Sequence, residues 1–314
     1  MRYISELRDG SRIQDVYLVK HKQSAVTKNG RNYENVILQD KTGQLDAKIW
    51  DPNSDAICEF DVLDYVYVAG SVSMFNGALQ ASLKQVRKAD PGEYIAADYL
   101  PMTKKNRKVM FNELVRLINT VGNPYLSALL KSFFTEDRDF IIAFAGHSAA
   151  KTVHHSFVGG LLEHTLSVTK LCDYLASTYP AINRDLLITA AMLHDIGKVY
   201  ELSDFPVNEY TDDGQLLGHI MIGAEMVHDH ASRIPDFPQK LETEVKHCIL
   251  AHHGEYEYGS PKKPAIIEAL ALNLADNTDA KLETMTEVLE SAAPDADWLG
   301  FNRFFDSNLR RTGE

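Results

Sequence analysis

The hydrophobic period of the chain changes once, near residue 90, and this change constrains the fold more than any other feature. Between Arg12 and about Lys88, apolar and polar residues alternate in short runs separated by turn residues, which is typical of β-strands. Beyond residue 107, apolar residues recur every three or four positions, which is typical of helices. With 314 residues, each part is long enough to bury its own core. We therefore expect a multi-domain chain, with a small all-β domain followed by an all-α domain.

Five strands are expected in the N-terminal part, which we place at residues 1–88. Residues 45–50 alternate between apolar and polar side chains, so that Trp50 falls on the exposed face. A second alternating set follows at Val62, Val66, Val68 and Val72. The pair Asn76-Gly77, flanked by apolar residues, predicts a tight hairpin. Strands at this spacing favour a small closed or partly open barrel.

Residues 89–106 show neither period and contain Pro91-Gly92 and Pro101, so we expect a linker there. Residues 107–293 are expected to form the helical domain. Its helices are predicted at 108–120, 124–133, 136–146, 159–178, 184–196, 216–232, 239–253 and 264–290. Prolines fall in the gaps between these helices, where a helix should end. Residues 294–314 are rich in aromatic residues, and we expect this tail to dock on the body of the domain.

The net charge of −12 at pH 7 does not exclude a polyanionic ligand, because the charge is unevenly distributed. Residues 1–90 carry 12 basic and 12 acidic side chains, so the acidic excess lies in the remaining 224 residues. Affinity for phosphate follows local charge more than total charge. The neutral N-terminal part can therefore present a basic groove to a nucleic acid.

The cysteines and the hydropathy of the sequence indicate the cellular compartment. Cys58, Cys172 and Cys248 are far apart, which argues against a disulfide framework or a cysteine zinc site and favours a reducing cytoplasm. No apolar run approaches the roughly 18 residues that span a bilayer. The N-terminus also lacks the apolar core of a signal peptide. We expect a cytoplasmic protein that does not bind a membrane.

Most of the twelve histidines lie between residues 147 and 253, and several coincide with predicted helix ends or buried helix faces. The residues that stand out are His164, the pair His194-Asp195, His219, the pair His252-His253, and Asp276. We expect Asp276 to be buried among Ala269, Leu270, Leu272 and Leu274, which is costly unless a cation neutralises it. Imidazoles with a carboxylate suit Mn²⁺, Fe²⁺ or Zn²⁺, and one carboxylate can bridge two such ions.

This ordered set resembles the HD superfamily of phosphohydrolases, whose central motif matches His194-Asp195-Ile196-Gly197-Lys198. The resemblance implies one metal held by His164, His194, Asp195 and Asp276. Asp195 would bridge to a second metal held by His219, His252 and His253, and the hydroxide between the metals would attack the phosphorus. Asp195 and Lys198 would be the catalytic residues, with Lys198 on the scissile phosphate.

Some of these residues have ordinary alternatives. Lys198 could be a cation at a helix C-terminus. His219 could be a helix residue without a ligand role, and one of His252 and His253 could face solvent or substrate. If these three did not converge, the site would hold one metal. The pair His154-His155 could contact substrate phosphate or pack structurally.

The resemblance extends to the N-terminal part. The turn at residues 40–43 followed by Ile49-Trp50 is similar to an OB-fold that binds tRNA anticodons or single strands. Combined with the His194-Asp195 motif, it resembles the YhaM family of bacterial 3′→5′ exoribonucleases along nearly the whole chain. That resemblance implies two divalent metals, Mn²⁺ first and Fe²⁺, Co²⁺ or Zn²⁺ otherwise. It also implies single-stranded RNA, or single-stranded DNA, as the substrate, with nucleoside 5′-monophosphates as the product. A homo-oligomer is left open.

The barrel offers residues for binding a single strand. Tyr33, Trp50 and Phe75 are candidates for stacking on bases, although Phe75 could equally belong to the core. Arg31 and Lys48 are candidates for contacting phosphates.

Two other functions are compatible with parts of the sequence. An HD site also suits a nucleotide or cyclic-dinucleotide phosphodiesterase. However, the chain after His252-His253 lacks the contiguous Gly-Tyr-Pro of the cyclic-di-GMP branch, and an OB-like module has no evident task in such an enzyme. A non-catalytic RNA-binding adaptor would be favoured by a missing ligand, but every expected ligand position is filled.

Overall fold

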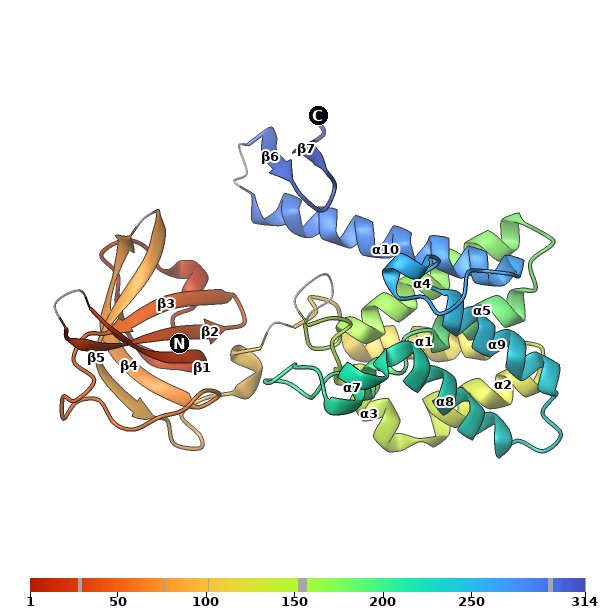
Figure 1. The fold of residues 1–314 in the computed structure, drawn as a ribbon, viewed down its shortest axis with the longest axis horizontal. Helices are drawn as coiled ribbons and strands as arrows, with labels where there is room; N and C mark the ends of the chain where they lie inside the picture. Colours follow the sequence, from red (N-terminus) through yellow and green to blue (C-terminus); the bar gives the residue numbers. More distant parts are fainter. Residues whose placement is uncertain (28–29, 76, 101, 152–156, 293–295, 314) are drawn as a thin grey trace. The chain divides into compact units, whose positions relative to one another are not determined.

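The computed structural model describes residues 1–314 apart from 28–29, 76, 101, 152–156, 293–295 and 314. The chain divides into two compact units. The first comprises Met1–Met102 with Asp204–Val207, and the second comprises Thr103–Ser203 with Asn208–Glu314. The expected fold class is confirmed, because a five-stranded closed barrel precedes a helical domain (Figure 1).

The barrel consists of strands β1 (Arg12–Val26), β2 (Asn32–Asp40), β3 (Gly43–Ile49), β4 (Tyr65–Phe75) and β5 (Ala78–Lys88). It closes in the order β1-β2-β3-β5-β4, with β3 and β5 parallel and the other neighbouring strands antiparallel. This is the five-stranded arrangement of an OB-fold. The alternation of residues works as predicted: Leu45, Ala47 and Ile49 are buried in the barrel core, and Trp50 is 52% exposed.

Two predictions about this unit need correction. Val62 does not belong to the buried face of a strand, because β4 begins at Tyr65 and Val62 is 45% exposed. Much of the segment predicted as a linker packs on the outside of the barrel. The Tyr94 ring stacks on Tyr65 with centroids 3.9 Å apart, and Tyr99 is buried against Val16. Aromatic side chains without a regular period can still bury apolar surface, which explains why the pattern missed this contact.

Every predicted helix is present in the second unit, although several ends differ by two or three residues. The helices are α1 (Arg107–Ile118), α2 (Pro124–Lys131), α3 (Arg138–Gly146), α4 (Gly160–Thr178), α5 (Arg184–Leu193), α6 (Lys198–Glu201), α7 (Asp212–Leu216), α8 (Gly218–Ser232), α9 (Gln239–Ala251) and α10 (Ile267–Ser291). The short helices α6 and α7 were not predicted, because neither has room for an apolar repeat. Side chains cap several N-termini; Asn183, for example, accepts a hydrogen bond from the Leu186 N–H at the start of α5.

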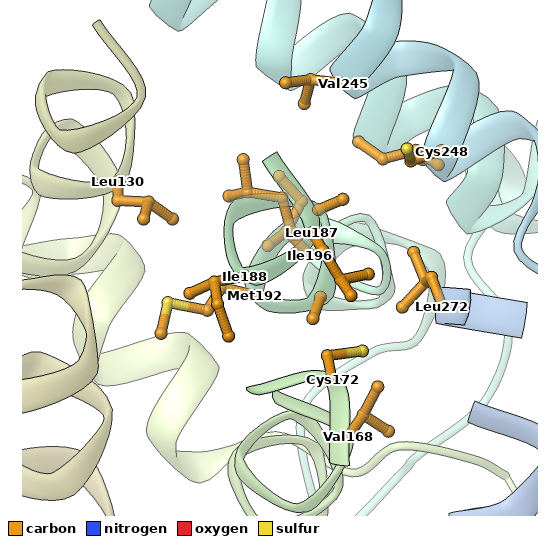
Figure 2. Packing of buried hydrophobic residues seen from close by; sticks show 14 of the residues in the cluster. Leu130, Val168, Cys172, Leu187, Ile188, Met192, Ile196, Val245, Cys248 and Leu272 are labelled. Carbon is orange, nitrogen blue, oxygen red and sulfur yellow. The ribbon is translucent and has the colours of Figure 1, made fainter. Parts of the chain in front are cut away.

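Helix α5 lies at the centre of the helical core (Figure 2). Residues 186–193 are all buried, so this helix is surrounded by the core on every side. Figure 2 shows Leu187, Ile188 and Met192 of α5 surrounded by side chains from four other helices. Those labelled are Leu130 of α2, Val168 and Cys172 of α4, Val245 and Cys248 of α9, and Leu272 of α10. The packing of α5 therefore fixes the position of the residues that directly follow it.

The C-terminal tail forms a hairpin of β6 (Trp298–Asn302) and β7 (Ser307–Arg310). The Arg311 guanidinium donates hydrogen bonds to the carbonyls of Leu289 and Ala292 at the end of α10. Leu309 is buried, whereas Trp298, Phe301 and Phe304 are all more than half exposed. Leu309 and Arg311 therefore contribute to the attachment of the hairpin, whereas these three aromatic side chains are largely exposed.

The cysteines Cys58, Cys172 and Cys248 are free thiols. Within the described ranges, no helix combines the length and the hydropathy needed to cross a membrane.

Candidate active site

The predicted ligands converge from five helices on one site in the second unit. His164 lies in the second turn of α4, and Asp276 lies in the middle of α10. The pair His194-Asp195 directly follows α5, and the pair His252-His253 directly follows α9. His219 is the second residue of α8. Residues separated by more than a hundred positions thus share one site because each lies at the end or on the buried face of a core helix.

Gly197 brings α8 close to the end of α5. A Cβ atom at this position would lie 2.1 Å from the carbonyl oxygen of His219 and 2.8 Å from the backbone nitrogen of Gly223. Only glycine allows this approach without moving the α8 backbone. The glycine of the His-Asp-Ile-Gly-Lys sequence therefore sets the distance between Asp195 and His219.

Four side chains form a first group. The Nε2 atoms of His164 and His194 are 3.2 Å apart, and each lies 3.4 Å from Asp195 Oδ2. Asp276 Oδ1 lies 3.2 Å from His164 Nε2 and 3.9 Å from His194 Nε2. Each histidine is at most 3% exposed. These atoms form a compact set of two imidazoles and two carboxylates, in which only Asp276, at 18%, is appreciably exposed.

The three remaining histidines form a second group beside the first. Ligand atoms of His219, His252 and His253 all lie within 4.8 Å of one another. Asp195 Oδ1 lies 3.5 Å from His219 Nε2 and 3.6 Å from His252 Nε2. The two oxygens of Asp195 therefore face different groups, and Asp195 is the carboxylate common to both.

The far side of each histidine ring is held by an acceptor. His164 Nδ1 lies 2.8 Å from Asp279 Oδ2, and His219 Nδ1 lies 2.9 Å from Glu201 Oε1. The other three rings have Nδ1 between 2.7 and 2.8 Å from backbone carbonyls, which belong to Ala191 for His194, Ile249 for His252 and Tyr258 for His253. An acceptor at Nδ1 places the proton there and leaves the Nε2 lone pair for a ligand.

This donor set fits divalent cations. Asp195 Oδ1 and His219 Nε2 are buried and have no hydrogen-bond partner among the described residues. Buried acceptors that face one another without donors are costly, and a cation removes that cost. Ligands about 2.1 Å from a common ion lie about 3.0 to 3.4 Å apart. The 3.2 to 3.9 Å separations in the first group are close to this spacing.

The carboxylates and imidazoles perturb one another strongly. Burial alone would raise the pKa of Asp195, but Lys198 and His194 hold that pKa well below its usual value. Burial would lower the pKa of His164, but hydrogen bonds to Asp195, Asp276 and Asp279 raise it well above normal. A proton on His164 and a cation at the same position would compete, so binding of a metal ion there would release a proton.

Lys198 is the cation already present at the site. Its Nζ donates to Asp195 Oδ2 over 2.6 Å, and its side chain is 16% exposed. Burial would lower the pKa of Lys198, but the charge of Asp195 raises it. Lys198 is the first residue of the four-residue helix α6 and lies beyond His194, the C-cap of α5.

The two groups open into a cavity of about 450 Å³. The predicted residues His164, Asp195, Lys198, His252, His253 and Asp276 line it. The remaining lining residues were not predicted and are Ala149, Tyr258, Asn273, Asn277, Ala280, Lys281 and Phe304. Leu270 and Leu274 are about half exposed, which corrects the expectation that they bury Asp276. Asp276 instead shares a face of α10 with Asn273 and Ala280, which follows from helical spacing.

Two residues that orient the site were missed. Asp279 follows Asp276 by three positions and so lies on the same face of α10, a signal that the spacing does contain. No sequence spacing predicts the contact of Glu201 with His219, because the segment that contains α7 separates the two residues along the chain. Outside the site, His228 Nδ1 lies 2.8 Å from Glu242 Oε1, and the His230 ring stacks on Phe133.

The candidate nucleic-acid residues gather on one face of the barrel. Tyr33, Lys48, Trp50 and Phe75 line a cavity of about 720 Å³, whereas Arg31 is not part of its lining. The rings of Tyr33 and Trp50 stack with centroids 5.2 Å apart. Phe75 is 58% exposed, so the alternative of a core position is wrong. His154 and His155 lie outside the described residues.

The chain is similar to a family model, to several named proteins and to part of one solved structure. The HD domain model matches residues 161–281. A protein named 3'-5' exoribonuclease YhaM from Listeria innocua is 33% identical over 286 residues, covering 91% of this chain and 90% of that protein. One with the same name from Geobacillus is 33% identical over 282 residues, covering 89% and 86%. The second OB-fold domain of replication protein A from Methanococcus maripaludis matches 29% of this chain and 96% of its own length, with 22% identity and a TM-score of 0.25.

Proposed function

Because the chain belongs to the YhaM family of 3′-5′ exoribonucleases, we propose that it hydrolyses single-stranded RNA from the 3′ end in a metal-dependent reaction. Nucleoside 5′-monophosphates are the proposed products, and single-stranded DNA is a second possible substrate. The observation that carries the proposal is the convergence of five imidazoles around Asp195, whose two oxygens face different groups. The HD domain and the named relatives already identify the chain as a phosphodiesterase.

The chain's own residues would hold two cations. His164, His194, Asp276 and Asp195 Oδ2 would bind the first, and His219, His252, His253 and Asp195 Oδ1 would bind the second. Divalent ions in such a pair lower the pKa of bound water and neutralise the charge that develops on the phosphoryl group. Mixed imidazole and carboxylate ligands suit Mn²⁺, which we expect first, and also Fe²⁺, Co²⁺ or Zn²⁺.

The acceptors at Nδ1 would keep this arrangement ready for substrate. With each Nδ1 proton held, the rings cannot rotate or change tautomer without losing a buried hydrogen bond. Lys198 would exchange part of its contact with Asp195 for the scissile phosphate when substrate and cations are bound. Its role would then be that of a positioned point charge.

The barrel face would bind the RNA upstream of the site of cleavage. Trp50 and Phe75 offer exposed rings for bases, and the partly buried Tyr33 stacks beside Trp50. Lys48 and Arg31 offer charge for phosphates. Such contacts do not depend on base identity, which suits an enzyme that removes nucleotides one after another. A cytoplasmic location is part of the proposal and is supported by the three free cysteines.

Labelled RNA tests the activity and its polarity. The purified protein is incubated with 5′-labelled and 3′-labelled single-stranded RNA, with Mn²⁺ or with EDTA. We expect Mn²⁺-dependent release of labelled mononucleotide from the 3′-labelled RNA at the first turnover, and progressive shortening of the 5′-labelled RNA. His194→Ala should abolish both, whereas His228→Ala, which lies outside the ligand groups, should not. Intact RNA together with cleavage of a cyclic dinucleotide would refute the proposal.

A further inference from the structure

The C-terminal hairpin contributes to the wall of the active-site cavity. Phe304 lies in the turn between β6 and β7, and its side chain lines the same cavity of about 450 Å³ as His164 and Asp276. The ring is 56% exposed. Figure 1 shows the hairpin folded back along α10 in the same unit. An exposed aromatic ring thus lies on the wall of a polar, metal-type site.

The turn that carries Phe304 is held in place by specific contacts. Asn302 Oδ1 accepts hydrogen bonds from the backbone N–H of Phe304 at 2.9 Å and of Phe305 at 3.4 Å. The Phe305 ring meets Phe304 edge to face, with centroids 5.0 Å apart. Arg311 attaches the hairpin to the end of α10. The position of the Phe304 ring is therefore built into the hairpin.

Helix α10 supplies a polar stripe along the same cavity. The lining residues Asn273, Asp276, Asn277, Ala280 and Lys281 are spaced by one, three or four positions, so they share one face of the helix. Lys281 is exposed and makes no ion pair within the described part of the chain. A cation without a partner, in a cavity that also holds carboxylates, is available for an anionic ligand.

We propose that Phe304 and Lys281 form a subsite for the end of the RNA strand, an inference that rests on the proposed function. The base of the 3′-terminal nucleotide stacks on Phe304, and Lys281 contacts the next phosphate along the strand. An aromatic ring beside a free cation is the combination that binds single strands without reading their sequence. The cavity volume lies within the range of small-molecule sites and suits a nucleotide rather than a duplex.

Phe304 is favoured over the other exposed aromatic residue of the cavity. Tyr258 also lines the cavity, but its backbone carbonyl holds His253 Nδ1, so its loop already serves the ligand groups. The hairpin has no part in holding a ligand among the described contacts. Binding the substrate gives a reason for Phe304 to remain exposed.

The test combines variants of the hairpin with RNA that lacks one base. Phe304→Ala should raise KM for ordinary RNA roughly 5- to 150-fold, the range of one lost base–aromatic stack, with little change in kcat. Phe304→Tyr keeps the ring face and should retain the original KM. Phe301→Ala is the matched control, because Phe301 is 60% exposed in the same hairpin but does not line the cavity.

RNA with an abasic 3′-terminal nucleotide identifies which base stacks. With this substrate the KM of Phe304→Ala and of the unaltered protein should be equal. If an abasic second nucleotide removes the difference instead, the terminal assignment is wrong. Lys281→Met should reduce the slope of log KM against log salt by about 0.7, the value for one phosphate contact on a single strand.

Two failures are distinguishable. If the unaltered protein leaves every RNA intact, the proposed function itself is wrong, and the subsite is wrong with it. If RNA is degraded normally and Phe304→Ala behaves like Phe301→Ala, the proposed function stands and the subsite is refuted.

Discussion

Glu201 offers a sharp test of how the second ligand group is built. Its Oε1 accepts from both the backbone N–H and the ring Nδ1 of His219, each over 2.9 Å. Burial would raise the pKa of Glu201, but its contacts with His219 lower that pKa, so the side chain is a carboxylate. Glu201→Gln removes this charge and halves the number of acceptor atoms. The amide oxygen that remains can still accept from the His219 ring, but the negative charge that strengthens this hydrogen bond and raises the basicity of Nε2 is lost.

The expected effect follows from the role of such partners in metal sites. Loss of a carboxylate behind a metal-bound histidine typically weakens metal binding 10- to 100-fold, which corresponds to about 1.4 to 2.7 kcal/mol. Only one of the two groups contains His219, so only one of the two steps of a Mn²⁺ activation curve should shift. The assay is the initial rate of RNA hydrolysis as a function of free Mn²⁺.

The chain contains a matched control. Glu242 Oε1 lies 2.8 Å from His228 Nδ1, a pair with nearly the same geometry that lies outside the ligand groups. Glu242→Gln should leave the Mn²⁺ dependence unchanged. Equal Mn²⁺ curves for Glu201→Gln and the unaltered protein would refute the assigned role of Glu201, as would equal shifts in the two variants.

Three further predictions concern separate parts of the molecule. Gly197→Ala should destabilise the fold by about 1 to 3 kcal/mol through overpacking against α8, measured by denaturant unfolding. Gly146→Ala should lower the free energy of unfolding less, because its added Cβ meets no atom within 4 Å. Equal losses in the two variants would contradict this prediction. Lys198→Met should lower kcat about 100- to 1,000-fold on a small chromogenic phosphodiester, and an unchanged kcat would remove Lys198 from the mechanism. Trp50→Ala should weaken RNA binding by about 1 to 3 kcal/mol and leave hydrolysis of the small phosphodiester unchanged. Trp298→Ala changes the other exposed tryptophan and should affect neither quantity. Equal loss of both in Trp50→Ala would count against RNA binding by the barrel face.

The order of secondary structure could be predicted because burial imposes a period on the sequence. The alternation around Ile49 indicates a strand with one face in the barrel interior, and the apolar run before His194 indicates a helix buried on every side. Residues 89–102 could not be placed in the same way. Tyr94 and Tyr99 attach this segment to the barrel through individual aromatic contacts, and such contacts have no period.

The residues that converge on the site could be predicted because the proposed metal chemistry restricts residue type. Imidazole and carboxylate are rarely buried together without a reason, so His164 and Asp276 stand out in apolar helices. The groups that orient the ligands could not be predicted to the same extent. Three of the five Nδ1 acceptors are backbone carbonyls, including those of Ala191 and Ile249, and every residue has a carbonyl. Phe304 also has no signal, because its place in the cavity depends on how the hairpin folds back.

Metal content tests most directly whether Asp195 joins two metal positions. The protein is loaded with Mn²⁺, freed of excess ion by gel filtration, and measured for bound manganese and for the magnetic coupling of neighbouring ions. We predict two ions per chain with a coupled spectrum, and one uncoupled ion in His219→Ala, which retains the first group intact. A single uncoupled ion in the unaltered protein, or none, would contradict the account.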